Sequence, residues 1–165
     1  MSVLTGSIVI FNERIEILTK AVNSFLEGTT DSVLYLIDNS PTDKVSHLFN
    51  HPRIIYKFND KNIGFGRGHN IAIREGMKRG SEYHLVLNPD VYFDNTVIED
   101  LHFFLNQNKD VGLIIPKVRY PDGRIQLVCR LLPDPWILLA KRFSPFYGGF
   151  LACLRAPEIV RFAAT

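Results

Sequence analysis

The sequence is poor in cysteine: Cys129 and Cys153 are the only two among 165 residues. Two cysteines without metal-ligand spacing predict neither a zinc site nor a disulfide framework, and they indicate a reducing compartment. No stretch approaches the roughly 18 consecutive apolar residues that cross a bilayer, and the chain does not start with a basic segment followed by a long apolar run. We therefore expect a cytoplasmic protein, either soluble or bound at a membrane surface.

The sequence also lacks a strong excess of charge. Its 19 lysines and arginines against 17 aspartates and glutamates give a formal net charge of +2. Dedicated nucleic-acid binders are usually more basic, so we do not expect a nucleic-acid partner. With 46% hydrophobic residues, the chain is long enough for one core and too short for two comfortable domains.

Three common nucleotide-binding motifs are missing as well. No glycine-lysine-serine/threonine triplet occurs, which excludes a P-loop. The turn after the first expected strand reads Phe11-Asn12-Glu13 and contains no glycine. A Rossmann fingerprint requires glycines at that turn, and a nucleotidyltransferase would carry a basic, glycine-rich loop there. Hydride transfer, nucleotide hydrolysis and nucleotidyl transfer are therefore disfavoured.

Short apolar runs alternate with longer amphipathic stretches, a pattern typical of βαβ units and a largely parallel sheet. The expected strands cover residues 7–11, 33–37, 54–58, 83–90, 111–118 and 125–128. Helical spacing of apolar residues predicts helices over 13–26 and 95–108, a short one over 44–49, and one that follows a glycine-rich loop at 62–70 and ends near 79.

Acidic residues stand at the carboxyl ends of two of the expected strands, at Asp38 and at Asn88-Pro89-Asp90. Open parallel sheets bind ligands at the carboxyl ends of their strands, so both acids should reach the same crevice. The loop with glycines at 64, 66 and 68 should join them, because its backbone can approach a ligand closely while Arg67 and His69 supply donors to phosphate. Taken singly, each acid could instead serve a turn or a helix cap, and the glycines a tight turn.

A site of this composition suits a nucleotide together with a metal ion. A divalent cation held by a carboxylate can neutralise a diphosphate as its bond to a sugar breaks. One protein carboxylate, phosphate oxygens and water suit Mg²⁺ or Mn²⁺. Asn88 could hydrogen-bond a ribose hydroxyl or an oxygen near the metal.

Four segments, in this order, resemble the family 2 glycosyltransferases of GT-A fold, and most of all their rhamnosyltransferase-like branch. They are residues 7–12, Ile37-Asp-Asn-Ser40, Asn62-x-Gly-Phe-Gly-x-Gly-x-Asn70 and Leu87-Asn-Pro-Asp-Val91, and the resemblance spans roughly residues 7–130. It implies an α/β GT-A fold with a mostly parallel sheet flanked by helices. It also implies inverting transfer of a sugar to a polysaccharide or lipid-linked acceptor, and the usual donor of this branch is deoxythymidine-diphosphate-rhamnose.

The resemblance assigns roles to individual residues. Asp38 would contact the nucleotide base, and Asp90 would be the main protein ligand to Mg²⁺ or Mn²⁺. The other implied donor-binding residues are Asn62, Gly64, Phe65, Arg67, Asn70 and Asn88, the last standing for the first acid of the family's Asp-x-Asp motif.

The family's catalytic base is not identifiable in this sequence. An acidic pair usually follows a Gly-Gly-Phe-like segment, but Gly148-Gly149-Phe150 is followed by Leu-Ala-Cys-Leu-Arg, and Glu158 is the only later carboxylate. We therefore expect residues 1–130 to form a donor-binding core and residues 131–165 an incomplete or atypical carboxyl-terminal segment of a truncated enzyme. The alternative is a non-catalytic, nucleotide-sugar-binding remnant.

The segment 136–150 interleaves apolar residues with Lys141 and Arg142. This pattern predicts either peripheral contact with a membrane or an apolar stretch whose packing partner is missing. The sequence does not indicate an oligomeric state.

Overall fold

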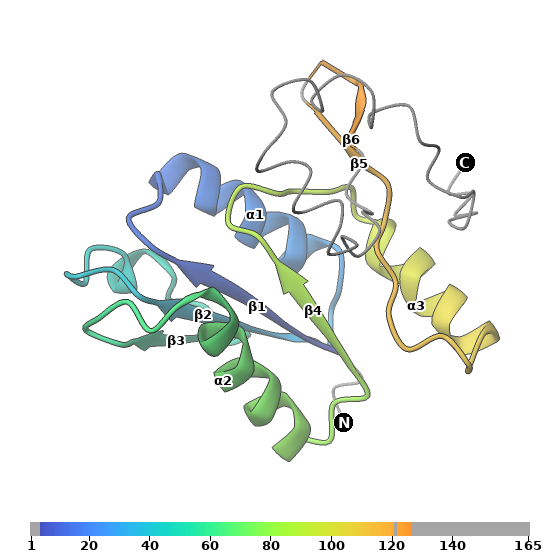
Figure 1. The fold of residues 1–165 in the computed structure, drawn as a ribbon, viewed down its shortest axis with the longest axis horizontal. Helices are drawn as coiled ribbons and strands as arrows, with labels where there is room; N and C mark the ends of the chain where they lie inside the picture. Colours follow the sequence, from blue (N-terminus) through green and yellow to red (C-terminus); the bar gives the residue numbers. More distant parts are fainter. Residues whose placement is uncertain (1–3, 121, 127–165) are drawn as a thin grey trace, which may run out of the picture. The chain divides into compact units, whose positions relative to one another are not determined.

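The computed structural model describes residues 4–120 and 122–126. It divides into two compact units, Met1–Asp110 and Val111–Thr165. The elements of the first unit are, in chain order, β1 Leu4–Ile10, α1 Ile15–Glu27, β2 Val33–Asp38, the 3₁₀ helix Ser46–Leu48, β3 Ile54–Phe58, α2 Phe65–Lys78, β4 Tyr83–Leu87 and α3 Val97–Gln107 (Figure 1). The predicted helix over 44–49 is thus a shorter 3₁₀ turn.

The sheet of this unit has four parallel strands in the order β3-β2-β1-β4. Its register places Ile10 opposite Asp38, and Ile8 opposite Leu87. The carboxyl ends of β1, β2 and β4 therefore reach the same edge, where ligands bind in open α/β sheets. The predicted α/β class with a mostly parallel sheet flanked by helices is confirmed.

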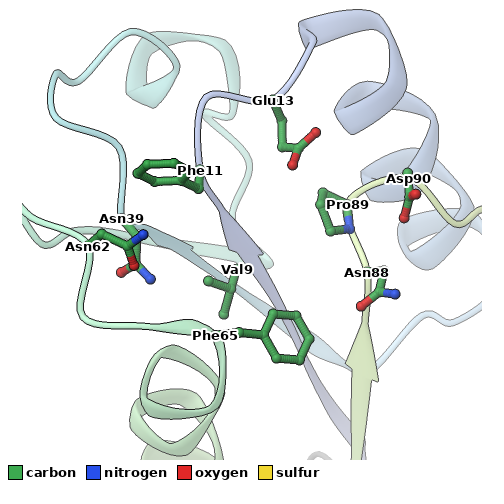
Figure 2. A pocket seen from close by; sticks show the side chains of 9 residues that line it. All are labelled: Val9, Phe11, Glu13, Asn39, Asn62, Phe65, Asn88, Pro89 and Asp90. Atoms are coloured by element: carbon green, nitrogen blue, oxygen red, sulfur yellow. The ribbon is translucent and has the colours of Figure 1, made fainter. Parts of the chain in front are cut away.

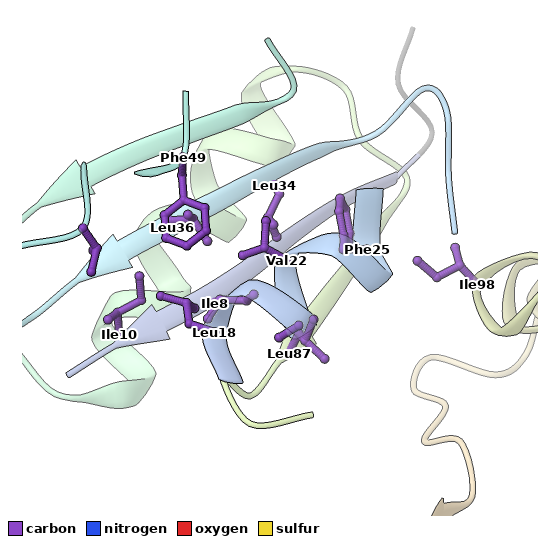
Figure 3. Close-up of a cluster of buried hydrophobic side chains, with 12 residues drawn as sticks. Ile8, Ile10, Leu18, Val22, Phe25, Leu34, Leu36, Phe49, Leu87 and Ile98 are labelled. Atoms are coloured by element: carbon purple, nitrogen blue, oxygen red, sulfur yellow. The ribbon is translucent and has the colours of Figure 1, made fainter. Parts of the chain in front are cut away.

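Helix α1 covers one face of the sheet and forms the main core (Figure 3). Its buried side chains recur at helical spacing, and they pack against the alternate residues Ile8 and Ile10 of β1. The contact is close at Gly6, where an added Cβ would lie 2.4 Å from the Phe25 ring. The helix ends at Gly28, whose N–H donates to the Ser24 carbonyl, as predicted.

Helix α2 covers the opposite face, where Val9, Tyr35, Ile37 and Ala72 form a second buried cluster. The predicted loop over 62–70 is wrong in its second half, because α2 already begins at Phe65. Gly64 alone among the loop's three glycines has a positive φ, +91°. Gly68 instead lets the helix approach the sheet, since an added Cβ there would lie 2.7 Å from Val9 Cγ2.

The second unit, by itself, contains a small antiparallel hairpin of β5 Val118–Arg119 and β6 Ile125–Gln126. The predicted turn before residue 125 is confirmed, with Tyr120 N–H donating to the Arg124 carbonyl. The predicted strand over 111–118 is wrong, because residues 111–117 pair with no described strand. Pro116 has no N–H to donate, and the Leu113 side chain is 78% exposed.

The predictions for residues 131–165, including Glu158 and the segment 136–150, lie outside the described residues. Within 4–120 and 122–126, no helix is long and apolar enough to cross a membrane.

Candidate functional site

A pocket of about 350 Å³ opens at the carboxyl edge of the sheet in the first unit. Figure 2 shows that its walls come from the segments that follow β1, β2, β3 and β4. The lining residues are Val9, Phe11, Glu13, Asn39, Asn62, Phe65, Asn88, Pro89 and Asp90. The site thus lies where the parallel topology predicts it.

Asn39 ties three of these segments together. Its backbone N–H donates to the Ile10 carbonyl at 2.8 Å, which joins the ends of β1 and β2. Its side-chain Oδ1 accepts a hydrogen bond from Asn59 Nδ2 at 2.9 Å, and its Nδ2 donates to the Gly64 carbonyl at 3.3 Å. Since Asn39 is only 1% exposed, it fixes the back of the pocket.

Asp38 precedes Asn39 and is also buried, but it does not line the pocket. Its Oδ1 accepts the Ser40 N–H at 2.8 Å, and its Oδ2 accepts the Tyr56 hydroxyl at 2.7 Å. The carboxylate therefore stabilises the turn after β2. Its implied contact with a nucleotide base stays a prediction.

The start of α2 forms one wall. Asn62 Oδ1 accepts the Gly64 N–H at 2.9 Å, and the positive φ of Gly64 turns the chain into the helix. Phe65, the first helical residue, exposes 53% of its surface and lines the pocket. The amino end of a 14-residue helix, which carries a partial positive charge, thus adjoins the pocket.

The opposite wall carries the acidic groups. Asn88, Pro89 and Asp90 follow β4, and the Val91 N–H closes their turn on the Asn88 carbonyl at 3.2 Å. Figure 2 shows the Glu13 carboxylate directed into the pocket from the segment after β1. No cluster of three or more His, Cys, Asp or Glu suited to a metal occurs in the described part of the chain. Two carboxylates and one amide oxygen are nevertheless the hard oxygen ligands that Mg²⁺ and Mn²⁺ prefer, with a diphosphate and water to complete the shell.

Of the residues predicted for this site, the structure brings together Asn62, Phe65, Asn88 and Asp90. The predicted residues Asp38, Gly64, Arg67 and Asn70 are not among those that line the pocket.

Sequence reasoning missed Phe11, Glu13 and Asn39. Phe11 and Asn39 lie within the segments 7–12 and 37–40 that carry the family resemblance but were not singled out there, whereas Glu13 belongs to no motif. Phe11 and Glu13 follow a buried strand. The rule that placed Asp38 and Asp90 at the edge of the sheet could have found them too.

The chain resembles a curated protein, two solved structures and one family model. The chain is 29% identical over 118 residues to the low-salt glycan biosynthesis hexosyltransferase Agl10 of Haloferax volcanii. This match covers 71% of the chain but only 38% of the relative, so the chain spans well under half the relative's length.

Solved structures of S. aureus TarS share the fold. TarS 1–349 matches with a TM-score of 0.54 and 17% identity, over 64% of this chain and 33% of TarS 1–349. TarS 1–349 in complex with UDP matches with a TM-score of 0.55 and 15% identity, over 73% and 43%. At these identities the likeness concerns the fold alone.

The model of the family described as Glycosyl transferase family 2 matches residues 7–149, which is most of the chain. The chain therefore belongs to family 2 of the glycosyl transferases.

Proposed function

We propose that the pocket binds the nucleotide-diphosphate part of a sugar donor for glycosyl transfer. One observation carries the proposal: in a chain of this family, the carboxyl edge of the sheet gathers Asn62, Phe65, Asn88 and Asp90 around one pocket. Aromatic, amide and carboxylate groups there suit a ligand with a flat base, hydroxyl groups and a metal-bound diphosphate. The UDP complex of TarS supports a nucleoside diphosphate as the ligand class.

The metal would be held by Asp90, with Glu13 and Asn88 as further oxygen ligands from the same pocket. When bound, Mg²⁺ or Mn²⁺ neutralises charge that develops on the departing diphosphate. The protein's part is to hold these oxygens at one side of the pocket while Phe65 and Asn62 bound the other side.

The proposal extends to the identity of the donor sugar and of the acceptor. The motifs that resemble the rhamnosyltransferase-like branch favour deoxythymidine-diphosphate-rhamnose, and the relative Agl10 is named a hexosyltransferase, a class that includes transfer of the six-carbon sugar rhamnose. A polysaccharide or lipid-linked saccharide is the proposed acceptor, and the cytoplasm, with possible peripheral contact to a membrane, is the proposed location. Competition between dTDP and UDP for the pocket tests which nucleotide the donor carries.

Transfer also requires a general base, whose loss costs roughly two to four orders of magnitude in rate. We propose that residues 1–130 supply donor binding, and we assign the base to none of the residues that the structure describes. The competing function is donor binding without transfer. Normal turnover by the 165-residue chain would contradict this competing function and leave the donor site intact.

Titration calorimetry tests the site. The full chain should bind UDP or dTDP in Mn²⁺, and EDTA should weaken binding. Asp90→Asn should lower affinity in Mn²⁺ by about tenfold or more, because a neutral amide is a poorer metal ligand. Asp94→Asn is a matched control, since Asp94 is exposed, lies four residues further on and does not line the pocket. Equal affinities for the two variants would contradict the assignment of Asp90.

A further inference from the structure

A chain of polar side chains crosses the face of the sheet that α2 covers. Ser7 lies at its centre with a fully buried hydroxyl, 2.7 Å from His69 Nδ1 on α2 and 2.7 Å from His84 Nε2 on β4. His84 Nδ1 lies 2.8 Å from the hydroxyl of Thr5, which donates to Ser81 Oγ at 3.2 Å.

The positions of the hydrogens in this series of hydrogen bonds follow from its Ser81 end. Ser81 Oγ donates to the Tyr83 carbonyl at 2.7 Å, and a carbonyl can only accept. Ser81 must therefore accept the proton of Thr5, and Thr5 must accept a proton from His84 Nδ1. Neutral His84 then offers an Nε2 lone pair to the Ser7 hydroxyl. Ser7, having donated its proton, can only accept from His69.

His69 is thereby a neutral imidazole with its proton on Nδ1. Burial lowers the pKa of His69, which favours this uncharged form. The ring is 3% exposed, and its Nε2 has no hydrogen-bond partner among the described residues. The bond to Ser7 is thus the one polar contact that fixes the orientation of this ring within the described structure.

The His69 ring in turn contacts the wall of the pocket. Phe65 and His69 lie one helical turn apart on α2, with ring centroids 4.3 Å apart and planes at 73°. Edge-to-face contacts of this kind favour one relative orientation of two rings. Phe65 is more than half exposed. The buried His69 ring is therefore the contact that restrains the orientation of the Phe65 ring.

We propose that Ser7 and His69 are positioning residues that hold Phe65 in the orientation in which it receives the nucleoside diphosphate. The inference rests on the proposed donor site and deepens it. Neither residue lines the pocket. The buried hydroxyl of Ser7 on β1 hydrogen-bonds the His69 ring on α2, and that ring contacts Phe65. Phe65 then meets the ligand as a preorganised wall, which lowers the entropy cost of binding.

A matched pair of variants isolates this role. Ser7 and Ser24 are both buried serines with a hydrogen-bonded hydroxyl, but the Ser24 hydroxyl donates to the Ala21 carbonyl within α1 and takes no part in the hydrogen bonds that lead to His69. Ser7→Ala should weaken binding of dTDP or UDP in Mn²⁺ by about fivefold, comparable to the loss of one aromatic contact. Ser24→Ala should leave the Kd unchanged, because Ser24 does not take part in positioning His69. Equal Kd changes for the two variants would overturn the proposal.

A double-mutant cycle on the nucleotide Kd distinguishes a positioning role of Ser7 from a general loss of stability. In the Phe65→Ala background, Ser7→Ala should have no further effect on the nucleotide Kd, because the group that it positions is gone. Additive effects would show that Ser7 does not act through Phe65.

A readout without nucleotide separates failure of this inference from failure of the donor site. The aromatic ¹H–¹³C resonances of Phe65 in the free chain should shift in Ser7→Ala and stay in place in Ser24→Ala. The His69 ¹⁵N shifts should show the Nδ1–H tautomer in the parent. Unchanged Phe65 resonances in Ser7→Ala, or an Nε2–H tautomer of His69, would overturn the positioning role even if nucleotide binds.

Discussion

The Tyr56 hydroxyl donates a hydrogen bond of 2.7 Å to Asp38 Oδ2, across the neighbouring strands β2 and β3. The same hydroxyl lies 3.0 Å from Asp43 Oδ1. Burial, together with the hydrogen bonds to Asp38 and Asp43, raises the pKa of Tyr56 well above its usual value. The carboxylate of Asp38 is thereby committed to the turn that presents Asn39 to the pocket.

Tyr56→Phe should therefore lower the free energy of unfolding by about 1–3 kcal/mol, because it leaves a buried carboxylate oxygen without its donor. Urea unfolding measures the loss. Tyr35→Phe is the matched control: the Tyr35 hydroxyl is buried with no partner among the described residues, so its removal should be neutral or stabilising. A greater loss in Tyr35→Phe than in Tyr56→Phe would contradict this account of the turn.

Two glycines in the first turn of α2 should respond in opposite ways to alanine. Gly68→Ala would place a Cβ 2.7 Å from Val9 Cγ2, so it should destabilise the fold and displace a residue that lines the pocket. A Cβ at Gly66 meets nothing within 4 Å, so Gly66→Ala should stabilise the helix by up to about 1 kcal/mol. Thermal unfolding and nucleotide affinity of the two variants check this. Equal stability would refute the close packing of α2 on β1.

The buried histidines should make stability depend on pH. Burial, with a smaller effect of nearby His69, lowers the pKa of His84 to about 4, against about 6.5 in an unfolded chain. Between these values the unfolded chain binds a proton that the folded chain does not, so the free energy of unfolding falls as pH drops from about 6.5 to about 4. After a discount for partial exposure of the ring, we expect a loss of about 2 kcal/mol.

Urea unfolding at several pH values measures this loss. His84→Gln should flatten the dependence, whereas a control change at exposed His47 should not. A dependence that persists unchanged in His84→Gln would assign the effect to other groups.

Much of the fold follows from local pattern. The strand at Ile54–Phe58 has the predicted bounds, because its apolar residues end where Asn59 and Asp60 turn the chain. The run over 111–118 looked equally apolar. A strand also needs a neighbouring strand to pair with, and a local sequence pattern does not show whether one is present. The start of α2 was misjudged because glycine is a poor helix former, and only the tertiary contact of Gly68 with Val9 explains its presence there.

The site shows the same limits. Asp90 was found because it follows a strand, but Glu13 was overlooked because it stands in no motif. Asp38 follows a strand as well, yet Tyr56 and Ser40 take both of its oxygens. Which way a side chain turns at the end of a strand depends on partners distant in sequence, and the sequence pattern does not contain them.

The central claim is that a nucleoside diphosphate binds at the carboxyl edge of β1, β2 and β4. The most direct test is an amide ¹H–¹⁵N NMR titration of the full chain with dTDP or UDP and Mg²⁺. Saturable shifts should gather at Asn39, Asn62, Phe65 and Asp90, and should be small in helix α3, none of whose residues lines the pocket. Shifts that avoid these four residues, or no shifts at millimolar nucleotide, would contradict it.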